Sequence, residues 1–495
     1  MTMPPGGTVR DWLDQRAATD DLAYLFFDED ETALSWAQLR TEARAVALQL
    51  CGLGIQKGES VAIVMPNGRA AVLAIFGALY GGFRTTMINL VAGDEAISYA
   101  LGHSDARVAL VGAAQREMFN RCRCGLDVQA ADALPVVDPA PVLPDLVAAD
   151  DALLMYTSGT TGRPKGVVHS HSSLLAGGWT TAQAHALTDQ DCGLCVLPIY
   201  HINALCVSVI GGLVSGARIA MAPKFSASQF WTQIAMAEAT WFSIVPTIVS
   251  HLLHGPNDPD TASRTRLRFG RSASSALSPD VHTAFETRFG VSLIETMGLT
   301  ETAAQILSNP LPPATRKIGS PGIAFGNEVQ ILMPDGAAAP PLQQGEIAVR
   351  GPNVMQGYLK NPDATADTMA PGGWLRTGDL GQMDAEGYVF VTGRLKELII
   401  KGGENIAPRE VDEVLYSHAD VVEAAAFARP CDIYGERVEA AVVLCDGSRL
   451  GTDDLLQLCL AKLGRFKSPD QIFVLPELPK GPSGKIQRRK IAEMT

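Results

Sequence analysis

The sequence predicts an α/β protein with a large N-terminal domain, residues 1–394, and a small, mobile α+β C-terminal lid domain, residues 395–495. Within Val61–Ile306, apolar segments such as VAIVMP and ARVALVG alternate with helical patterns, which is typical of parallel sheets covered by helices. The pattern then changes to short strand pairs joined by turns, as in EVQILMPDG and GYVFVTGR, and predicts a β-rich subdomain over about 327–394. A compact set of helices and strands follows it.

The bulk composition agrees with this division and excludes several protein classes. A chain of 495 residues exceeds the size at which one hydrophobic core stops growing, so two or more domains are expected. Hydrophobic residues make up 47% and charged residues 19%, a globular mixture that argues against disorder and against a membrane-embedded protein. The net charge of −13 disfavours nucleic-acid and anionic-membrane partners, because both need a basic surface.

The N-terminal stretch MTMPPGGTVRDWL has no signal-peptide pattern, and the longest apolar runs, near Ala71–Gly82 and Ala204–Ser215, are too short to span a bilayer. We therefore expect a cytoplasmic protein, either a monomer or a homodimer. The nine cysteines are expected to be mostly reduced and buried. Cys192 and Cys195 form one CxxC, but no second pair or histidine cluster follows at zinc spacing, so we predict neither a metal site nor redox use there.

The most informative segment is YTSGTTGRPKG at 156–166, directly after the apolar strand predicted over Ala152–Met155. Its glycines let the backbone bend and bring N–H groups close to an anion, while hydroxyls and a lysine add donors and positive charge. The loop is neither a Walker A loop nor a dinucleotide-binding GxGxxG. A solvated turn needs only about four such residues. We therefore predict a polyphosphate site formed by Thr157, Ser158, Gly159, Thr160, Thr161, Gly162 and Lys165.

With this loop, the sequence resembles the adenylate-forming superfamily of acyl-CoA synthetases, adenylation domains and beetle luciferases. The likeness runs over essentially the whole chain in the family's order. The further matching stretches are LPIYHINA at 197–204, ETMGLTET at 295–302, GGWLRTGDL at 372–380, GRLKELIIKGGENIAPREVD at 393–412 and LPKGPSGKIQRR at 478–489.

The resemblance implies roles for residues around ATP. Thr300 would hydrogen-bond the α-phosphate and Glu301 would act through Mg²⁺, which is normally held by one carboxylate and substrate phosphates. Asp379 would accept hydrogen bonds from the ribose hydroxyls, and Arg394 would hold the ribose or phosphate end. Taken singly, these residues also fit a helix start or ordinary turns. The adenine slot would be lined by Ser274, Ser275 and Ala276 and by Glu295, Thr296 and Met297, where many relatives have tyrosine in place of the methionine.

Lys485 corresponds to the lysine that bridges the carboxylate and the α-phosphate during adenylation, where a positive charge offsets charge gathering on phosphorus. His201 would guard the acyl pocket, and Lys396 would be the hinge of the lid. After adenylation the lid would rotate, withdraw Lys485 and present Lys401, Gly402, Gly403 and Glu404 to the coenzyme A arm.

For the acid, stretches such as FSASQFW at 225–231, SNPLP at 308–312 and GPNVMQGY at 351–358 resemble the oxalyl-CoA synthetase branch. That implies a small, polar, possibly dianionic acid, and Arg271 would supply a cation for its second anionic group, although it also fits a structural arginine at a strand end. That branch has histidines where this chain has Asn203 and Ala304. Their loss makes the pocket less cationic and roomier, which leaves oxalate, malonate, a sulfonated acetate or a short monocarboxylate open.

The implied function is an AMP-forming acyl-CoA synthetase that uses ATP, Mg²⁺ and coenzyme A. Loading of a separate carrier protein is the alternative acceptor. A luciferase-like oxygenase is less favoured, because nothing marks a luciferin pocket. A degenerate, non-catalytic relative is disfavoured by the joint presence of Lys165, Thr300, Glu301, Asp379, Arg394 and Lys485.

Overall fold

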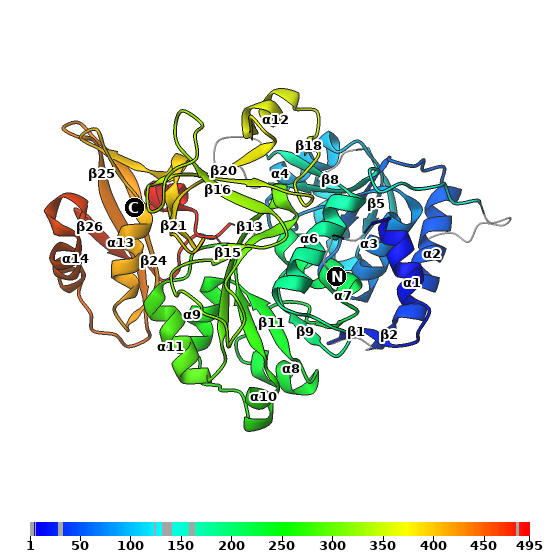
Figure 1. Cartoon of the computed structure of the whole chain (residues 1–495), viewed down its shortest axis with the longest axis horizontal. Coiled ribbons are helices and arrows are strands. Elements are labelled where there is room, and N and C mark those ends of the chain that lie inside the picture. The colour runs from blue at the N-terminus through cyan, green and yellow to red at the C-terminus, as the bar shows by residue number, and fades with distance from the viewer. Residues whose placement is uncertain are drawn as a thin grey trace.

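The computed structural model describes residues 4, 6–27, 33–122, 125–130, 141–157, 164–481 and 485–495, and Figure 1 shows the whole chain. Within these residues, four sheets organise the molecule. Two large sheets form most of the N-terminal part, a smaller sheet follows them in sequence, and a fourth sheet belongs to the C-terminal domain at the left of Figure 1.

The nine-stranded sheet has the order β15-β14-β13-β12-β11-β9-β10-β1-β2. Its central strands, from β13 to β1, are parallel and buried, as expected for a sheet covered on both faces. Its strands are β1 (Leu22–Phe26), β2 (Ala33–Ser35), β9 (Cys192–Cys195), β10 (Arg218–Met221), β11 (Trp241–Ile244), β12 (Phe269–Ser272), β13 (Leu293–Leu299), β14 (Ala304–Ser308) and β15 (Ile323–Ala324).

The seven-stranded sheet has the order β18-β8-β7-β4-β3-β5-β6 and is parallel from β7 to β6. Its strands are β3 (Ser60–Val64), β4 (Arg84–Met87), β5 (Ala106–Val111), β6 (Asp127–Ala130), β7 (Asp151–Tyr156), β8 (Gly166–Ser170) and β18 (Gly357–Tyr358). β8 and β14 are antiparallel to the strands before them, whereas the sequence pattern predicted parallel sheets. The reason is that β7–β8 and β13–β14 are joined by connections too short for a parallel crossover.

Helices cover both sheets. Helix α6 contacts strands of both sheets. Its Gly177 lies so close to the backbone before β14 that a Cβ would be 2.3 Å from the carbonyl oxygen of Ala303. The helices of this part are α1 (Val9–Arg16), α2 (Trp36–Gly52), α3 (Arg69–Gly81), α4 (Asp94–His103), α5 (Arg116–Arg121), α6 (His171–Ala184), α7 (Gly211–Ser215), α8 (Phe230–Met236), α9 (Pro246–His254), α10 (Thr261–Arg266) and α11 (Pro279–Phe289), with short helical segments at Ala113–Gln115, Asn203–Ile210 and Thr300–Thr302.

The third sheet is antiparallel, with the order β16-β17-β20-β19 and β21 paired to β20. Its elements are β16 (Glu328–Leu332), β17 (Gly345–Arg350), α12 (Pro362–Thr368), β19 (Met369–Ala370), β20 (Trp374–Met383) and β21 (Val389–Arg394). It encloses an apolar cluster that includes Ile347, Leu375 and Val389.

A 3-10 turn, Leu395–Glu397, follows β21, and the C-terminal elements after it have their own core, in which Ile399, Val411, Leu415 and Leu455 are fully buried. Its elements are β22 (Ile399–Lys401), β23 (Glu404–Ile406), α13 (Pro408–Tyr416), β24 (Val421–Cys431), β25 (Gly435–Leu444), α14 (Thr452–Lys467), β26 (Gln471–Val474) and α15 (Arg488–Met494). The predicted fold class, a large α/β N-terminal part with a smaller C-terminal domain, is confirmed. The boundary after residue 394 and the hinge at Lys396 stay predictions.

Candidate active site

The phosphate loop joins the antiparallel strands β7 and β8. Thr157 N donates to the carbonyl oxygen of Lys165 at 2.9 Å, which closes the two ends of the loop. The Lys165 ammonium lies 4.5 Å from the centre of the Tyr358 ring, and both residues line a small cleft. The predicted residues Ser158, Gly159, Thr160, Thr161 and Gly162 lie outside the described residues.

Thr300 and Glu301 begin a 3-10 turn after β13, and side chains from distant elements hold both of them. The Tyr358 hydroxyl donates to Glu301 Oε1 at 2.9 Å, and burial together with the Glu301 charge raises the pKa of Tyr358. His169 Nε2 lies 2.7 Å from the Thr300 carbonyl oxygen, and burial lowers the pKa of His169 to about 4. The imidazole is therefore neutral at physiological pH and donates to this carbonyl.

Sequence reasoning gave no role to Tyr358 or His169. Tyr358 ends the stretch GPNVMQGY, which drew attention only as a branch likeness, and His169 follows the phosphate loop by four residues. No sequence motif marks either residue, because each one acts through a contact with the Thr300–Glu301 turn, which is far away in the sequence.

The two residues predicted to bind the ribose come from neighbouring strands. Asp379 on β20 and Arg394 at the end of β21 are directly opposite in register, and Arg394 Nε donates to Asp379 Oδ1 at 2.5 Å. The carboxylate is largely buried, and its charge raises the pKa of Arg394. A fixed carboxylate of this kind can accept hydrogen bonds from hydroxyl groups.

Lys485 belongs to the C-terminal domain and lies within range of this pair. Burial, followed by the charge of Arg394, lowers the pKa of Lys485 to about 8, while Asp379, Glu397 and Glu301 act in the opposite direction. The structure thus brings together an ammonium group, the Asp379–Arg394 pair and Glu301. Two cationic side chains, Lys485 and Arg394, are thus interleaved with the carboxylates of Asp379 and Glu301.

The two adenine segments also meet. Glu295, 2% exposed, accepts a hydrogen bond through Oε1 from Leu277 N at 3.2 Å, which ties β13 to the turn that contains Ser275 and Ala276. Burial raises the pKa of Glu295. Ser274 has a positive φ of 74°, and Thr296 and Met297 continue along β13. Met297 packs against the apolar cluster of the third sheet.

The candidate acyl pocket contains a buried cation. Arg271 on β12 is 1% exposed, and its Nη1 donates to Asn203 Oδ1 at 2.7 Å and to Ser243 Oγ at 3.1 Å. Its Nε donates to Gln305 Oε1 at 3.2 Å. The hydrogen-bond partners given for it within the described ranges are all neutral side chains, and burial lowers the pKa of Arg271 to about 9. The guanidinium is thus held by neutral groups, and burial of a charge without an opposite charge is costly.

Asn203 links the pocket to the nucleotide side, because its Nδ2 donates to Ser274 Oγ at 3.1 Å. Ala304 lies nearby in sequence to Gln305 and is 4% exposed, with a positive φ of 79°. His201 stacks edge to face on Tyr200, with ring centroids 4.9 Å apart. Gln305 was missed by sequence reasoning, since an interior glutamine of a short strand has no distinguishing signal.

The predicted acceptor face is not brought to this site. Lys401 is 5% exposed, its Nζ donates to the carbonyl oxygen of Phe466 at 3.1 Å, and the rings of Tyr434 and Phe466 lie near it. Gly402 and Gly403 turn with positive φ, and Glu404 is exposed. Lys396 is exposed beside the start of the C-terminal domain. Lys485 therefore lies in the electrostatic range of Asp379, Arg394 and Glu301, whereas Lys401 contacts Phe466 of its own domain.

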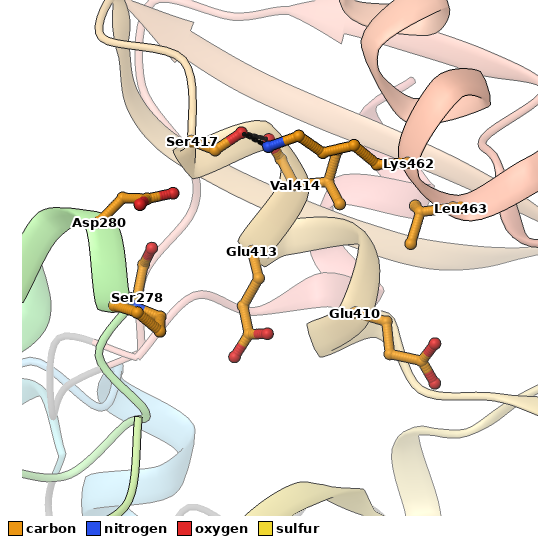
Figure 2. Close-up of a pocket in the computed structure, with 9 residues that line it drawn as sticks. Ser278, Asp280, Glu410, Glu413, Val414, Ser417, Lys462 and Leu463 are labelled. Carbon is orange, nitrogen blue, oxygen red and sulfur yellow. Dashed lines mark hydrogen bonds between the residues drawn. The ribbon is translucent and has the colours of Figure 1, made fainter. Parts of the chain in front are cut away.

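Another cleft separates α11 from α13 and α14 of the C-terminal domain (Figure 2). Asp280 and Glu413 line it from opposite sides, and Lys462 Nζ donates to Ser417 Oγ at 2.9 Å across its upper edge in this view. It contains none of the predicted nucleotide residues. It marks a part of the domain interface that is not closely packed.

Other expectations concern metals, thiols and membranes. Where the chain is described, no cluster of three or more histidine, cysteine or acidic side chains has metal-binding geometry, and Cys192 and Cys195 are free thiols. None of the described helices has the length and apolar character needed to cross a bilayer.

Comparisons with known proteins identify the family of the chain. The sequence model of the AMP-binding enzyme family matches residues 11–359, and that of the AMP-binding enzyme C-terminal domain matches residues 410–485. Sulfoacetate–CoA ligase from Cupriavidus necator is 44% identical over 95% of this chain and 94% of that enzyme. Oxalate–CoA ligase from Arabidopsis thaliana is 34% identical, with 91% of each chain covered. ATP-bound MatB from Rhodopseudomonas palustris has a TM-score of 0.88 at 28% identity, with 98% of each chain covered.

The chain belongs to the AMP-binding enzyme family. More narrowly, it is an acid–thiol ligase of the adenylate-forming type, an acyl-CoA synthetase that uses ATP, Mg²⁺ and coenzyme A. The resemblance predicted from the sequence, including its relation to the oxalyl-CoA branch, is confirmed.

Proposed function

We propose that this enzyme converts a small acid with a second anionic group, of the sulfoacetate type, to its coenzyme A thioester in the cytoplasm, as a monomer or homodimer. The observation that carries the choice of acid is Arg271, a buried guanidinium that only neutral side chains contact among the described residues. An unpaired charge in the interior is costly, so a pocket of this kind favours a ligand that supplies the opposite charge. The 44% identity to sulfoacetate–CoA ligase supports the same choice.

In the first half-reaction, a carboxylate oxygen of the acid attacks the α-phosphorus of ATP, and the bond to the pyrophosphate oxygen breaks. Lys485 would offset the negative charge that gathers during this exchange, and its position near Arg394, Asp379 and Glu301 supports that role. Thr300 and the phosphate loop orient the phosphates, and Asp379 with Arg394 fixes the ribose. His201 and Ala304 would contact the acyl group.

Glu301 is the residue that would hold Mg²⁺. Its Oε1 accepts a hydrogen bond from the Tyr358 hydroxyl. The described residues contain no group of three or more side chains that could hold a metal without a substrate, and one carboxylate together with substrate phosphates suits Mg²⁺. Bound Mg²⁺ would neutralise phosphate charge. Tyr358 keeps the carboxylate oriented for that purpose.

In the second half-reaction, the coenzyme A thiolate attacks the acyl carbon, the bond to the AMP phosphate oxygen breaks, and AMP leaves. We propose that the C-terminal domain turns about Lys396 between the two steps and brings the turn of Lys401, Gly402, Gly403 and Glu404 toward the acyl group. Positive φ values at both glycines fit a turn that an extended thiol arm can approach closely.

The test is an acid panel with wild-type enzyme and the Arg271→Met variant, scored by CoA-dependent AMP formation. Sulfoacetate, malonate and oxalate are compared with acetate and propionate. Loss of a buried charge partner costs about 2–5 kcal/mol, so kcat/KM for the preferred dianion should fall by roughly 30-fold or more. The values for acetate and propionate should change much less.

Two results would argue against this assignment. If wild-type enzyme preferred acetate or propionate, the short-chain monocarboxylate alternative would replace it. If Arg271→Met reduced activity equally toward mono- and dianionic acids, the arginine would be structural. A separate carrier protein as acceptor would be favoured if free coenzyme A gave no thioester.

A further inference from the structure

A buried carboxylate of the C-terminal domain, Glu423 on β24, lies at the contact with the N-terminal part. It is 3% exposed, and two basic side chains lie within 4 Å of its carboxylate. Lys480 Nζ is 2.5 Å from Glu423 Oε1, and His251 Nε2 of α9 is 3.7 Å from the same oxygen. A buried charge without an opposite charge is strongly destabilising, so the Glu423 carboxylate is held in place by its contacts with Lys480 and His251.

Lys480 starts the hairpin that carries Lys485. Lys480 and Ile486 form an antiparallel bridge, and Gly481 N donates to the Lys485 carbonyl oxygen at 2.6 Å. On the other side of Lys485, Arg488 Nη2 lies 2.6 Å from Asp412 Oδ2. Each leg of the hairpin is thus anchored by an ion pair to the domain, with the adenylation lysine between the two anchors.

The N-terminal part contacts the same place through α9, which lies beside β24 in Figure 1. Ser250 Oγ donates to the carbonyl oxygen of Val422 at 2.5 Å, next to Glu423. The charged and titratable groups that face His251 are Glu423, Lys480 and His254. Burial lowers the pKa of His251, so the imidazole is neutral at physiological pH and Lys480 supplies the positive charge.

We propose that the Glu423–Lys480 ion pair, seated against α9, is a positioning device that sets Lys485 at the α-phosphate for adenylation. Neither residue touches the nucleotide or the acid. The pair acts through the hairpin, and it rests on the two-step reaction proposed above. It should matter for acyl-adenylate formation and not for transfer of the acyl group to coenzyme A, because Lys485 has a charge to offset only in the first step.

The experiment measures acid-dependent ATP–pyrophosphate exchange and, separately, thioester formation from supplied acyl-AMP and coenzyme A. Displacement of a catalytic group by about 1 Å can cost roughly 100-fold, so Glu423→Gln and Lys480→Gln should each lower kcat for exchange by about 10- to 100-fold. KM for ATP should change little, because the interaction lost serves the transition state. The double variant should be no worse than either single variant. Lys480→Arg, which keeps the charge, should restore exchange to near the wild-type rate.

Glu439→Gln is the matched control. Glu439 is 1% exposed on the adjacent strand β25 and pairs with Arg429 at 2.7 Å and Arg437 at 2.6 Å, and none of the three belongs to the hairpin. If this variant lowered exchange as much as Glu423→Gln, or if the Glu423 and Lys480 variants lost both half-reactions equally, the positioning role would be refuted. A wild-type enzyme that exchanged pyrophosphate with no acid would instead refute the proposed function, and this inference with it.

Discussion

Replacement of Lys485 by alanine should separate the two half-reactions. The lysine lies in the electrostatic range of Asp379, Arg394 and Glu301, and in the proposed mechanism it has negative charge to offset only while the α-phosphorus reacts. Removal of one preorganised donor at such a centre costs about 2.7–4 kcal/mol, so acid-dependent pyrophosphate exchange should fall by roughly 100- to 1,000-fold. Thioester formation from supplied acyl-AMP should stay within about twofold of wild type, because that step forms no new charge at phosphorus for the lysine to offset.

The pH dependence gives a second measure of the same group. The pKa of Lys485 is lowered to about 8, so the ammonium form predominates below that pH and is lost above it. By pH 9 only about a tenth of the molecules would be protonated, and kcat/KM for exchange should drop by about tenfold from its plateau, since this constant reports the free enzyme. Thioester formation should not show this alkaline loss of activity, because Lys485 takes no part in that step.

The control for both measurements is Lys490→Ala, which removes an exposed lysine from α15 of the same domain. It should leave both half-reactions unchanged. The reasoning would be refuted if Lys485→Ala slowed thioester formation as much as exchange, or if the alkaline limb of exchange persisted unchanged in that variant.

Two further substitutions test how the site is held. Tyr358→Phe removes the hydroxyl that donates to Glu301, and loss of such a supporting contact typically weakens metal binding by about 10- to 100-fold. Pyrophosphate exchange by this variant should therefore need more Mg²⁺ and recover at high Mg²⁺. An unchanged Mg²⁺ titration would contradict this. Gly177→Ala places a Cβ 2.3 Å from the Ala303 carbonyl oxygen. This clash should destabilise the fold by about 1–3 kcal/mol and displace the neighbouring Thr300–Glu301 turn. Thermal unfolding measures the destabilisation, and a wild-type melting temperature would contradict it.

The sequence predicted the sheet-and-helix rhythm and the residues with a chemical signature. Lys485, Asp379 and Arg394 could be named in advance because they stand in recognisable stretches, and the structure brings them together. Edge strands were harder to predict. The antiparallel directions of β8 and β14 follow from the length of the preceding connection and not from apolar periodicity.

The supporting contacts could not be predicted, because each depends on packing between distant segments. His169 and Thr300 are 131 residues apart in sequence, and Arg271 and Gln305 come from strands separated by β13. For Arg271, the sequence left a structural and a ligand-binding interpretation open. Its burial among neutral groups favours the second.

The end of β21 has a double duty. Arg394, which grips the carboxylate of Asp379, is the last residue of that strand, and the next residue already belongs to the turn from which the C-terminal domain departs. A displacement of the Arg394 guanidinium is therefore coupled to the backbone from which the C-terminal domain begins. We therefore expect a nucleotide that binds this pair to influence the orientation of the C-terminal domain directly, because Arg394 and the turn that follows it are adjacent in the chain.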